Sequence, residues 1–401
     1  MTFKPLQAND VVSTRTLLHE AIPLTGTIVS GTYNDENIKN YSHGMFQSVY
    51  DYPYLSSSAN HIFDLTVGYS TDSALYTATA TANGQKAKKK NIYNQMCQVL
   101  MGYDATGSIL KFDEDGDIIG GGRKMNEVII MPFSRLLVKD EIKKESFSMT
   151  LGVSGSYWDK GKLGKRDPFA NAKIKIMDVS ASSEYRVNSP VGEYGILYAT
   201  ASVAGANGQQ LETNATCVHT ASIGGFTYWY AGLLFYQAGI AVLTASLFQE
   251  NATATTNPGA LLKTLAGGPG EHFRFISGSK SGGAGLFKNV NEALTGSAIS
   301  ASCEAFRHRI ANVQFNNTTE LNSTVYFCRA NHNEFNYSSN PTYLSGSKIR
   351  VKSQASDDPV AYITTVGLYN DNNELMATAK LSEPLKKSPS TEFTIRTRLD
   401  Y

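Results

Sequence analysis

Cys328, His332 and Glu334 lie close together in one polar stretch of the chain, FCRANHNEFNYSSNPTYLSGS, which runs from Phe327 to Ser347. Thiolate, imidazole and carboxylate groups are the ligands that proteins offer to zinc, and a structural zinc site takes four of them. Two further Cys–His pairs, near positions 217 and 303, could converge on the same ion. A metal site at Cys328, His332 and Glu334 is therefore one hypothesis.

The same stretch permits two other interpretations. A Cys–His nucleophile pair is disfavoured, because nothing nearby indicates an activated thiolate or an oxyanion hole. An ordered loop is favoured, because Asn and Ser side chains satisfy main-chain groups in turns. In this interpretation Phe335, Tyr337 and Tyr343 anchor the loop, and we expect Phe335 and Tyr337 to contribute to an assembly surface.

A second group of oxygen ligands lies in the segment FDEDGDIIGGG. Asp113, Asp115 and Asp117 alternate like the first three ligands of an EF-hand calcium loop. The pattern then fails, because the sixth and twelfth positions hold Ile118 and Lys124 where an EF-hand needs glycine and glutamate. A solvated acidic turn is favoured over a weak calcium site.

Phosphate-binding and catalytic motifs are missing from the sequence. The glycine-rich pieces LAGGPGEH and SGSKSGGAG, within residues 264–285, lack the spacing of nucleotide-binding loops. The sequence also holds no GxSxG, no HExxH and no carboxylate pair in a clear helical frame. We therefore predict no enzyme activity, no catalytic residue, no cofactor and no bound metal.

The composition favours strands over helices. The chain holds 36 basic and 35 acidic residues, a net charge of +1, and its charged fraction of 18% is low compared with ~25% in an ordinary soluble domain. Ser, Thr, Asn and Gly together with 22 Tyr and 18 Phe replace the missing charge, and such a mixture is typical of strands and turns. We expect no nucleic-acid partner and a mainly β fold with a minor helical element, built from β-sandwich-like domains with an extended N-terminal arm.

The pattern along the chain suggests four segments. They are an arm over residues 1–33, a β-rich domain over 34–150, a β-rich middle domain with glycine-rich loops over 151–310 and a C-terminal β domain over 311–401. The clearest helix is predicted at about 84–103, where Ile92, Met96, Val99 and Leu100 share one face. Its lysines, from Lys86 to Lys90, are expected to face water.

The longest run without charge, residues 220–249, is long enough to cross a membrane as a helix. Ser, Thr, Gln and Gly interrupt it, and no Lys or Arg flanks it closely. We predict two buried strands joined near Gln237 to Gly239, and no membrane span.

Both ends of the chain carry patterns suited to assembly. The N-terminal arm supplies Leu17, Leu18, Ile22, Leu24 and Ile28 as candidate interface residues. In the C-terminal segment EFTIRTRLDY, one face holds Phe393, Ile395, Leu399 and Tyr401, and the other holds Thr394, Arg396, Arg398 and Asp400. A strand that keeps its alternation to the last residue is expected to pair with a neighbour in this subunit or the next.

Several passages resemble virion structural proteins of marine tailed bacteriophages of the T4-like, contractile-tail type. The passages are LLHEAIPLTGTIVSGTYNDENIKNYSHGMFQSVYDYPYLSSSANHIFDLTVGYS, FDEDGDIIGGGRKMNEVIIMPFSRLLVKDEIKKESF, FCRANHNEFNYSSNPTYLSGSKIRV and YITTVGLYNDNNELMATAKLSEPLKK. The resemblance covers both ends and the first third of the chain, and the Thr/Gly-rich middle is less similar. It implies a particle component of the tail, baseplate or neck, without catalysis, assembled in the host bacterial cytoplasm.

We therefore expect a structural protein that joins other virion proteins and copies of itself in a symmetric ring, through exchanged strands and arms. Two alternatives stay open. A tail-tip or fibre-like adhesin would bind a cell-surface glycan through Tyr and Asn, although the sequence shows no fixed-period repeat. A tail-associated hydrolase would need two carboxylates ~5–9 Å apart.

Overall fold

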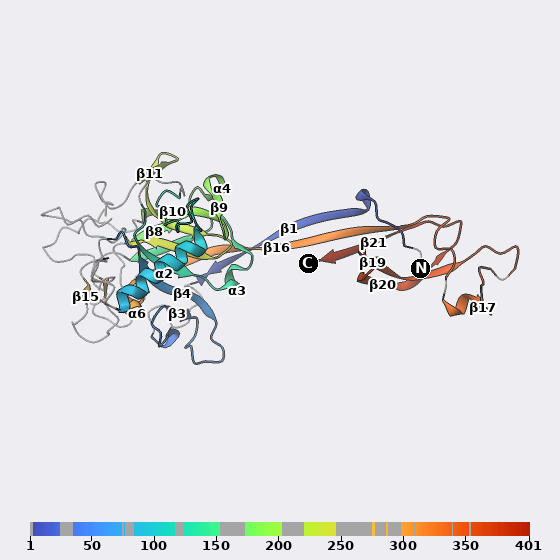
Figure 1. The fold of residues 1–401 in the computed structure, drawn as a ribbon, viewed down its shortest axis with the longest axis horizontal. Coiled ribbons are helices and arrows are strands. Elements are labelled where there is room, and N and C mark those ends of the chain that lie inside the picture. The colour runs from blue at the N-terminus through green and yellow to red at the C-terminus, as the bar shows by residue number, and fades with distance from the viewer. Residues whose placement is uncertain are drawn as a thin grey trace. The chain divides into compact units, whose positions relative to one another are not determined.

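The computed structural model has the predicted class, mainly β with a minor helical element (Figure 1). It describes residues 3–24, 35–73, 76, 84–116, 124–152, 173–202, 220–245, 275–276, 286–287, 298–307, 310–338, 340–352 and 354–401. Two of the candidate residues, Ile28 and Asp117, lie outside these ranges.

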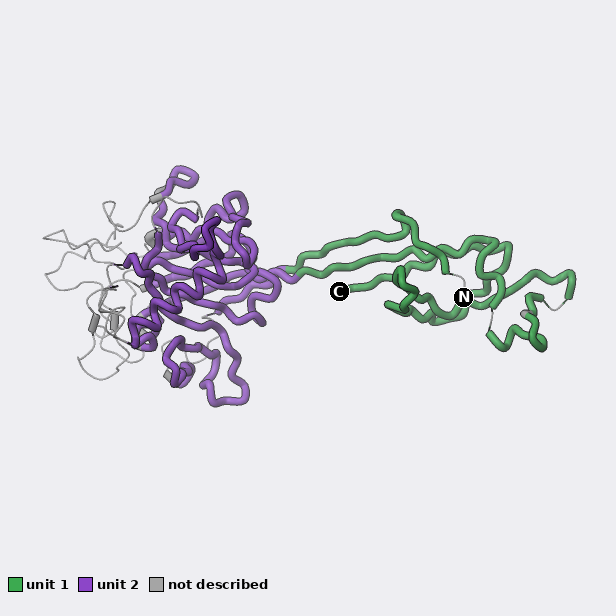
Figure 2. The backbone as a smooth tube through the Cα atoms, in the orientation of Figure 1, with its two compact units in different colours: residues 1–18, 320–401 green, residues 19–319 purple. Residues whose placement is uncertain are grey.

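The chain divides into two compact units, coloured separately in Figure 2. Unit 1 comprises Met1–Leu18 and Glu320–Tyr401, and unit 2 comprises His19–Thr319. Unit 1 therefore joins the two ends of the chain. The segment borders expected from sequence, after residues 33, 150 and 310, coincide with neither border of these units.

Unit 2 is built on a large sheet in which neighbouring strands run antiparallel. The strand order is β16, β7, β8, β10, β12, β13, β5, β4, β3 and β2. Their bounds are β2 Ile38–Asn40, β3 Gln47–Tyr50, β4 His61–Tyr69, β5 Glu127–Pro132, β7 Ser148–Gly152, β8 Lys173–Met177, β10 Gly192–Ser202, β12 Phe226–Phe235, β13 Ile240–Thr244 and β16 Ile310–Ala330, the last of which continues into unit 1. Short strands β6 (Glu141–Ile142), β9 (Arg186–Ser189) and β11 (Thr220–Ile223) pair with β16, β10 and β12.

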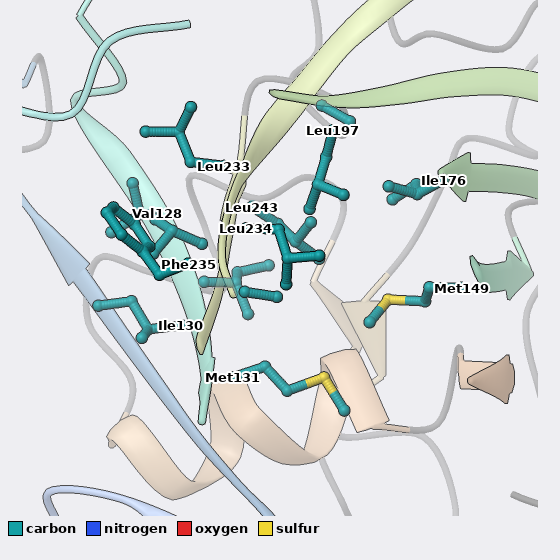
Figure 3. Packing of buried hydrophobic residues seen from close by; sticks show 14 of the residues in the cluster. Val128, Ile130, Met131, Met149, Ile176, Leu197, Leu233, Leu234, Phe235 and Leu243 are labelled. Carbon is teal, nitrogen blue, oxygen red and sulfur yellow. The ribbon is translucent and has the colours of Figure 1, made fainter. Parts of the chain in front are cut away.

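The hydrophobic core lies along the central strands of this sheet, as the close view in Figure 3 shows. In register, Leu233 of β12 lies opposite Val242 of β13, and Val242 lies opposite Ile130 of β5. Consecutive residues of β12, from Leu233 to Phe235, are fully buried. Because neighbours in a strand point to opposite faces, both faces of the sheet are covered here. This explains why these strands appear in the sequence as continuous apolar runs.

The uncharged run at 220–249 forms strands, as predicted, within its described part, which ends at residue 245. Strands β12 and β13 pair antiparallel and are joined through Gln237 and Gly239. Gly239 has φ +66°, a backbone conformation that favours glycine. In the part of the chain that the structure describes, no helix combines the length and apolar character needed to cross a membrane.

Helix α2, Gly84–Leu100, confirms the predicted helix but not all of its buried face. Val99 is 55% exposed and Lys89 is fully buried, so the expectations for these two residues were wrong. The buried positions are Lys89, Ile92, Tyr93, Cys97 and Leu100. The helix packs on β4 so closely that a Cβ added at Gly68 would lie 2.9 Å from the carbonyl oxygen of Lys89.

A second helix, α6 (Ile299–Arg307), also packs on β4. The Cys303 Sγ–H donates to the main-chain oxygen of Leu65 at 3.2 Å. The remaining short elements are α3 Arg135–Val138, α4 Ala181–Glu184, the 3-10 turns η1 Ala8–Asp10, η2 Asp35–Asn37 and η5 Pro341–Tyr343, and the strand pairs β14 Phe275–Ile276 with β15 Leu286–Phe287 and β17 Leu344–Ser345 with β18 Lys348–Ile349.

Unit 1 contains a three-stranded sheet and a hairpin. The sheet has β16 at its centre, with β1 (Val11–Pro23, in unit 1 as far as Leu18) on one side and β21 (Phe393–Asp400) on the other. The hairpin joins β19 (Ala361–Tyr369) to β20 (Leu375–Lys387) through a turn with the sequence NDNN, residues 370–373. Asn373 has φ +61° there, and its N–H donates to the oxygen of Asn370 at 3.0 Å.

Candidate assembly surface

Unit 1 has no hydrophobic core of its own in its described residues. Every member of the buried apolar cluster of the protein lies between Leu24 and Phe315, inside unit 2. Among the described residues of unit 1, the buried apolar ones are Val325, Ala330 and Ala361. Folding a unit of this size needs apolar burial to offset the loss of conformational entropy. Unit 1 therefore lacks within itself the burial that would hold it folded.

Apolar side chains are exposed instead. Of the 24 large apolar side chains that are exposed in the described part of the chain, 16 lie in unit 1, which holds about a third of the described residues. On β1, Leu17 is 45% and Leu18 51% exposed, and Val11 and Val12 are exposed as well. Neighbouring residues of a strand point to opposite faces, so these exposed apolar side chains are candidates for contact with a partner on each face of β1.

Strand β21 confirms the alternation predicted for residues 393–400. On one face, Phe393, Ile395 and Leu399 are half-buried and Thr397 is buried. The residues of the other face, Thr394, Arg396, Arg398 and Asp400, are exposed. The strand pairs antiparallel with β16, from Ser323 opposite Asp400 to Ala330 opposite Phe393. The terminal strand is thus paired within its own chain, and Tyr401 beyond it is 75% exposed.

Both faces of the three-stranded sheet carry apolar side chains. Tyr326 and Cys328 of β16 lie on the face shared by Ile395 of β21, and Val325 and Phe327 lie on the opposite face. The face of Ile395 is the more apolar of the two, because β21 places Thr394, Arg396, Arg398 and Asp400 on the other face. Half-buried and exposed residues on both faces mean that the covering in unit 1 is incomplete.

Two candidate residues of the N-terminal arm belong to the core of unit 2. Leu24 is fully buried in the apolar cluster, and Ile22 packs against it. Their side chains are used inside the chain, so Leu17 and Leu18 are the described arm candidates that remain exposed.

The stretch that begins at Phe327 ends β16 and continues as an ordered loop that is tied down by two charged side chains. The Nζ of Lys387 donates to the oxygen of His332 at 3.2 Å, to Oδ1 of Asn336 at 2.8 Å and to the oxygen of Ser388 at 2.8 Å. Glu334 accepts from the N–H of Asn331 at 3.0 Å and pairs with Lys4 at 2.5 Å. This pairing lowers the pKa of the Glu334 carboxyl. Phe335, at φ +53°, and Tyr337 are exposed, so they do not anchor the loop by burial.

Cys328, His332 and Glu334 have separate partners. His332 Nδ1 lies 3.1 Å from Glu392 Oε1 at an exposed position, and Glu334 pairs with Lys4. Cys328 is half-buried on β16, and burial raises the pKa of its thiol, which disfavours the thiolate. Within the described residues, no group of three or more His, Cys, Asp or Glu side chains is arranged to hold a metal ion.

In the acidic turn, the first carboxylate, that of Asp113, has a structural role. Asp113 is fully buried and forms an ion pair with Lys124, next to an isolated bridge between these two residues. Oδ1 of Asp113 also accepts from the N–H of Asp115 at 3.3 Å, which closes an Asx turn. Burial raises the pKa of Asp113 to about 7.

One polar cluster in unit 2 has no counterpart in any sequence motif. Asp64 Oδ1 accepts from Ser48 Oγ at 2.5 Å and lies 2.8 Å from His61 Nε2. In a serine-hydrolase triad the histidine lies between the serine and the acid, because it takes the serine proton. Here the acid lies between the other two, so the cluster lacks the geometry of a nucleophilic serine. Only the pairing of β3 with β4 brings these residues together.

Comparison of the chain with protein-family models, with curated proteins and with solved structures gave no match.

Proposed function

We propose that this protein is a structural component of a tailed-phage virion and that unit 1 is its assembly module. The observation that carries the proposal is the concentration of exposed apolar side chains in a unit with no hydrophobic core among its described residues. A chain with this property is suited to a permanent assembly, in which partners bury what one subunit leaves exposed.

The sequence resemblance to virion structural proteins of contractile-tailed marine phages supports the choice of particle. It favours the tail, the baseplate or the neck as the location, with assembly in the host bacterial cytoplasm. Low net charge and balanced charged residues are consistent with protein partners rather than nucleic acid.

The exposed edges of strands can join two subunits through main-chain hydrogen bonds. A free edge offers unpaired N–H and C=O groups to a neighbouring strand, and the hydrogen bonds formed are directional, so they also set the register of the two subunits. No catalytic step is required of such a protein.

Immunogold labelling of intact particles tests the proposal. Antibody raised against the recombinant chain is applied to whole phage and to separated tails and heads, and antibody pre-absorbed with the same recombinant chain serves as the control. We expect label confined to the tail, its baseplate or its neck. Particles that carry no label, from a lysate in which the chain is abundant, would contradict a virion role.

A further inference from the structure

The three-stranded sheet of unit 1 has two free edges. β16 is its central strand, and among the described residues of unit 1 each of β1 and β21 has β16 as its single strand neighbour. Free edges invite pairing with another chain unless Pro, Lys or a bulge blocks them. Between Val11 and Leu18, β1 holds neither Pro nor Lys.

The two free edges run in the same direction. β21 is antiparallel to β16. β1 is also antiparallel to β16. Asp10 pairs with Arg329 at 2.7 Å, Ser13 Oγ lies 3.3 Å from Thr324 Oγ1, and Arg15 pairs with Glu320. The residue numbers rise along β1 as they fall along β16, which is the pattern of an antiparallel pair. Strands β1 and β21 are therefore parallel, on opposite sides of β16.

The levels of the two edges also correspond. Thr14 Oγ1 donates to the oxygen of Ser323 at 3.5 Å, and Ser323 lies opposite Asp400 in the register of β21. Thr14 and Asp400 are thus level with the same residue of the central strand. A rotation about an axis along the strands brings Asp400 of one copy beside Thr14 of the next without a shift along the axis.

We propose that further copies of this chain complete unit 1, with the free edge of β21 in one copy paired to the free edge of β1 in the next. The contact rests on the assembly role proposed above and names its partner as a second copy of this chain. Its two surfaces differ, so repetition of the contact gives a ring when the rotation between copies closes on itself. The basic and acidic residues of unit 1 nearly balance, so copies do not repel one another through net charge.

Apolar burial follows from the same arrangement. Closing the sheet on itself turns one face of every copy inward, and the apolar side chains of β1, β16 and β21 on that face then cover one another. This supplies the core that a single copy lacks. The edges of β1 and β21 already agree in direction and in level, so a second copy fits both edges. A different protein would need strands that agree with each edge separately.

The molar mass of the purified full chain is the first test, by light scattering after size exclusion and by native mass spectrometry. We expect a multiple of the 43.6 kDa chain mass at micromolar concentration. Leu17→Asp should reduce the mass to that of one chain, because Leu17 lies on the same face as Ser13 and Arg15 of β1, which is the face of Ile395 and Leu399. The control Leu136→Asp changes a leucine of unit 2 that is 83% exposed and should leave the oligomer unchanged. A wild-type chain that is monomeric would overturn the proposal.

Cross-linking tests the edges themselves and does not depend on the folding of Leu17→Asp. In a chain with Cys217 and Cys328 replaced by Ser, Thr14→Cys and Asp400→Cys are made as separate variants, co-expressed and treated with a short bismaleimide. We expect linked pairs containing one chain of each kind, and few or none when either variant is expressed alone. Equal linking of Thr14→Cys with itself, or no linking in the mixture, would contradict pairing of β21 with β1.

These outcomes are distinct from those of the labelling experiment. A monomeric chain that is nevertheless found in the tail would overturn self-pairing alone. A ring-forming chain that is missing from particles would overturn the virion role alone.

Discussion

The Nζ of Lys387 lies 2.8 Å from Oδ1 of Asn336 and donates in addition to the main-chain oxygens of His332 and Ser388. All three protons of this ammonium group are thus used. The side chain comes from the end of β20 and holds a loop that follows β16, so it joins two elements of unit 1 that are 51 residues apart in sequence.

Replacing Lys387 with Met should loosen the loop over residues 331–336. Three acceptors lose their donor, and unsatisfied acceptors cost ~1–3 kcal/mol in total when water does not replace the donor. We expect amide hydrogen exchange in the loop to become about tenfold faster, since ~1.4 kcal/mol corresponds to tenfold. The neighbouring Lys386 is exposed, and Lys386→Met is the matched control. Equal exchange in both variants would show that Lys387 does not hold the loop.

Gly68→Ala should destabilise unit 2, because the added Cβ would lie 2.9 Å from Lys89 O and 3.0 Å from Tyr93 N. These are main-chain atoms, which cannot move aside as the end of a flexible side chain can. Helix α2 must therefore shift away from β4, which lowers the free energy of unfolding by ~1–3 kcal/mol. Urea denaturation measures the change. Gly84→Ala, at the start of the same helix with open space around it, should change stability by less than ~0.5 kcal/mol. Similar values for the two variants would mean that the close approach is not tight.

Burial of Asp178 makes stability depend on pH. The carboxylate accepts from the N–H groups of Glu145 at 2.8 Å and Phe147 at 3.0 Å and from the hydroxyl of Tyr236 at 3.3 Å. Burial nevertheless raises its pKa to about 7, above the ~3.9 of an unfolded chain. Its contribution to the free energy of unfolding is therefore fully present below about pH 4 and is lost as the pH rises through 7.

Asp178→Asn isolates this contribution. An amide oxygen cannot accept from both main-chain N–H groups in the same way, so the variant should be less stable by ~1–3 kcal/mol. The loss should be larger at pH 4 than at pH 7, because the wild-type contribution falls over that interval. Urea denaturation of both proteins at a series of pH values provides the difference. A loss that grows with pH would contradict a raised pKa.

Lys89→Met should remove a pH dependence of stability between pH 8 and 10. Burial lowers the pKa of Lys89 to about 8, so the charged form is carried at a cost at pH 7. The stabilising contribution of the neutral amine is present above the unfolded pKa of ~10.4 and is lost as the pH falls through 8. We expect the stability of Lys89→Met relative to the wild type to rise by ~1–3 kcal/mol as the pH falls from 10 to 7. Lys86→Met, on a less buried part of α2, serves as the control, and a gain equal to that of Lys89→Met would show that burial of Lys89 is not the cause.

Local patterns in the sequence predicted those elements whose form depends on their own residues. The alternation of Phe393, Ile395 and Leu399 predicted a strand with one more buried face. The continuous apolar run at 220–249 predicted buried strands, because only a sheet covered on both faces tolerates such a run. Hydrophobic periodicity and turn chemistry act over a few residues, so these features are visible without a fold.

Pairing between distant segments was decided by the tertiary structure. Lys89 is buried because α2 packs against Gly68 of β4. The local sequence around Lys89 does not indicate this burial. Ser48, Asp64 and His61 meet because β3 pairs with β4, and Cys328, His332 and Glu334 stay apart because Lys4, Glu392 and β16 engage them separately. The division into two units likewise depends on the packing of residues 1–18 with residues 320–401. Side chains from remote strands meet only after the sheet has set their register, and register is a property of the whole fold.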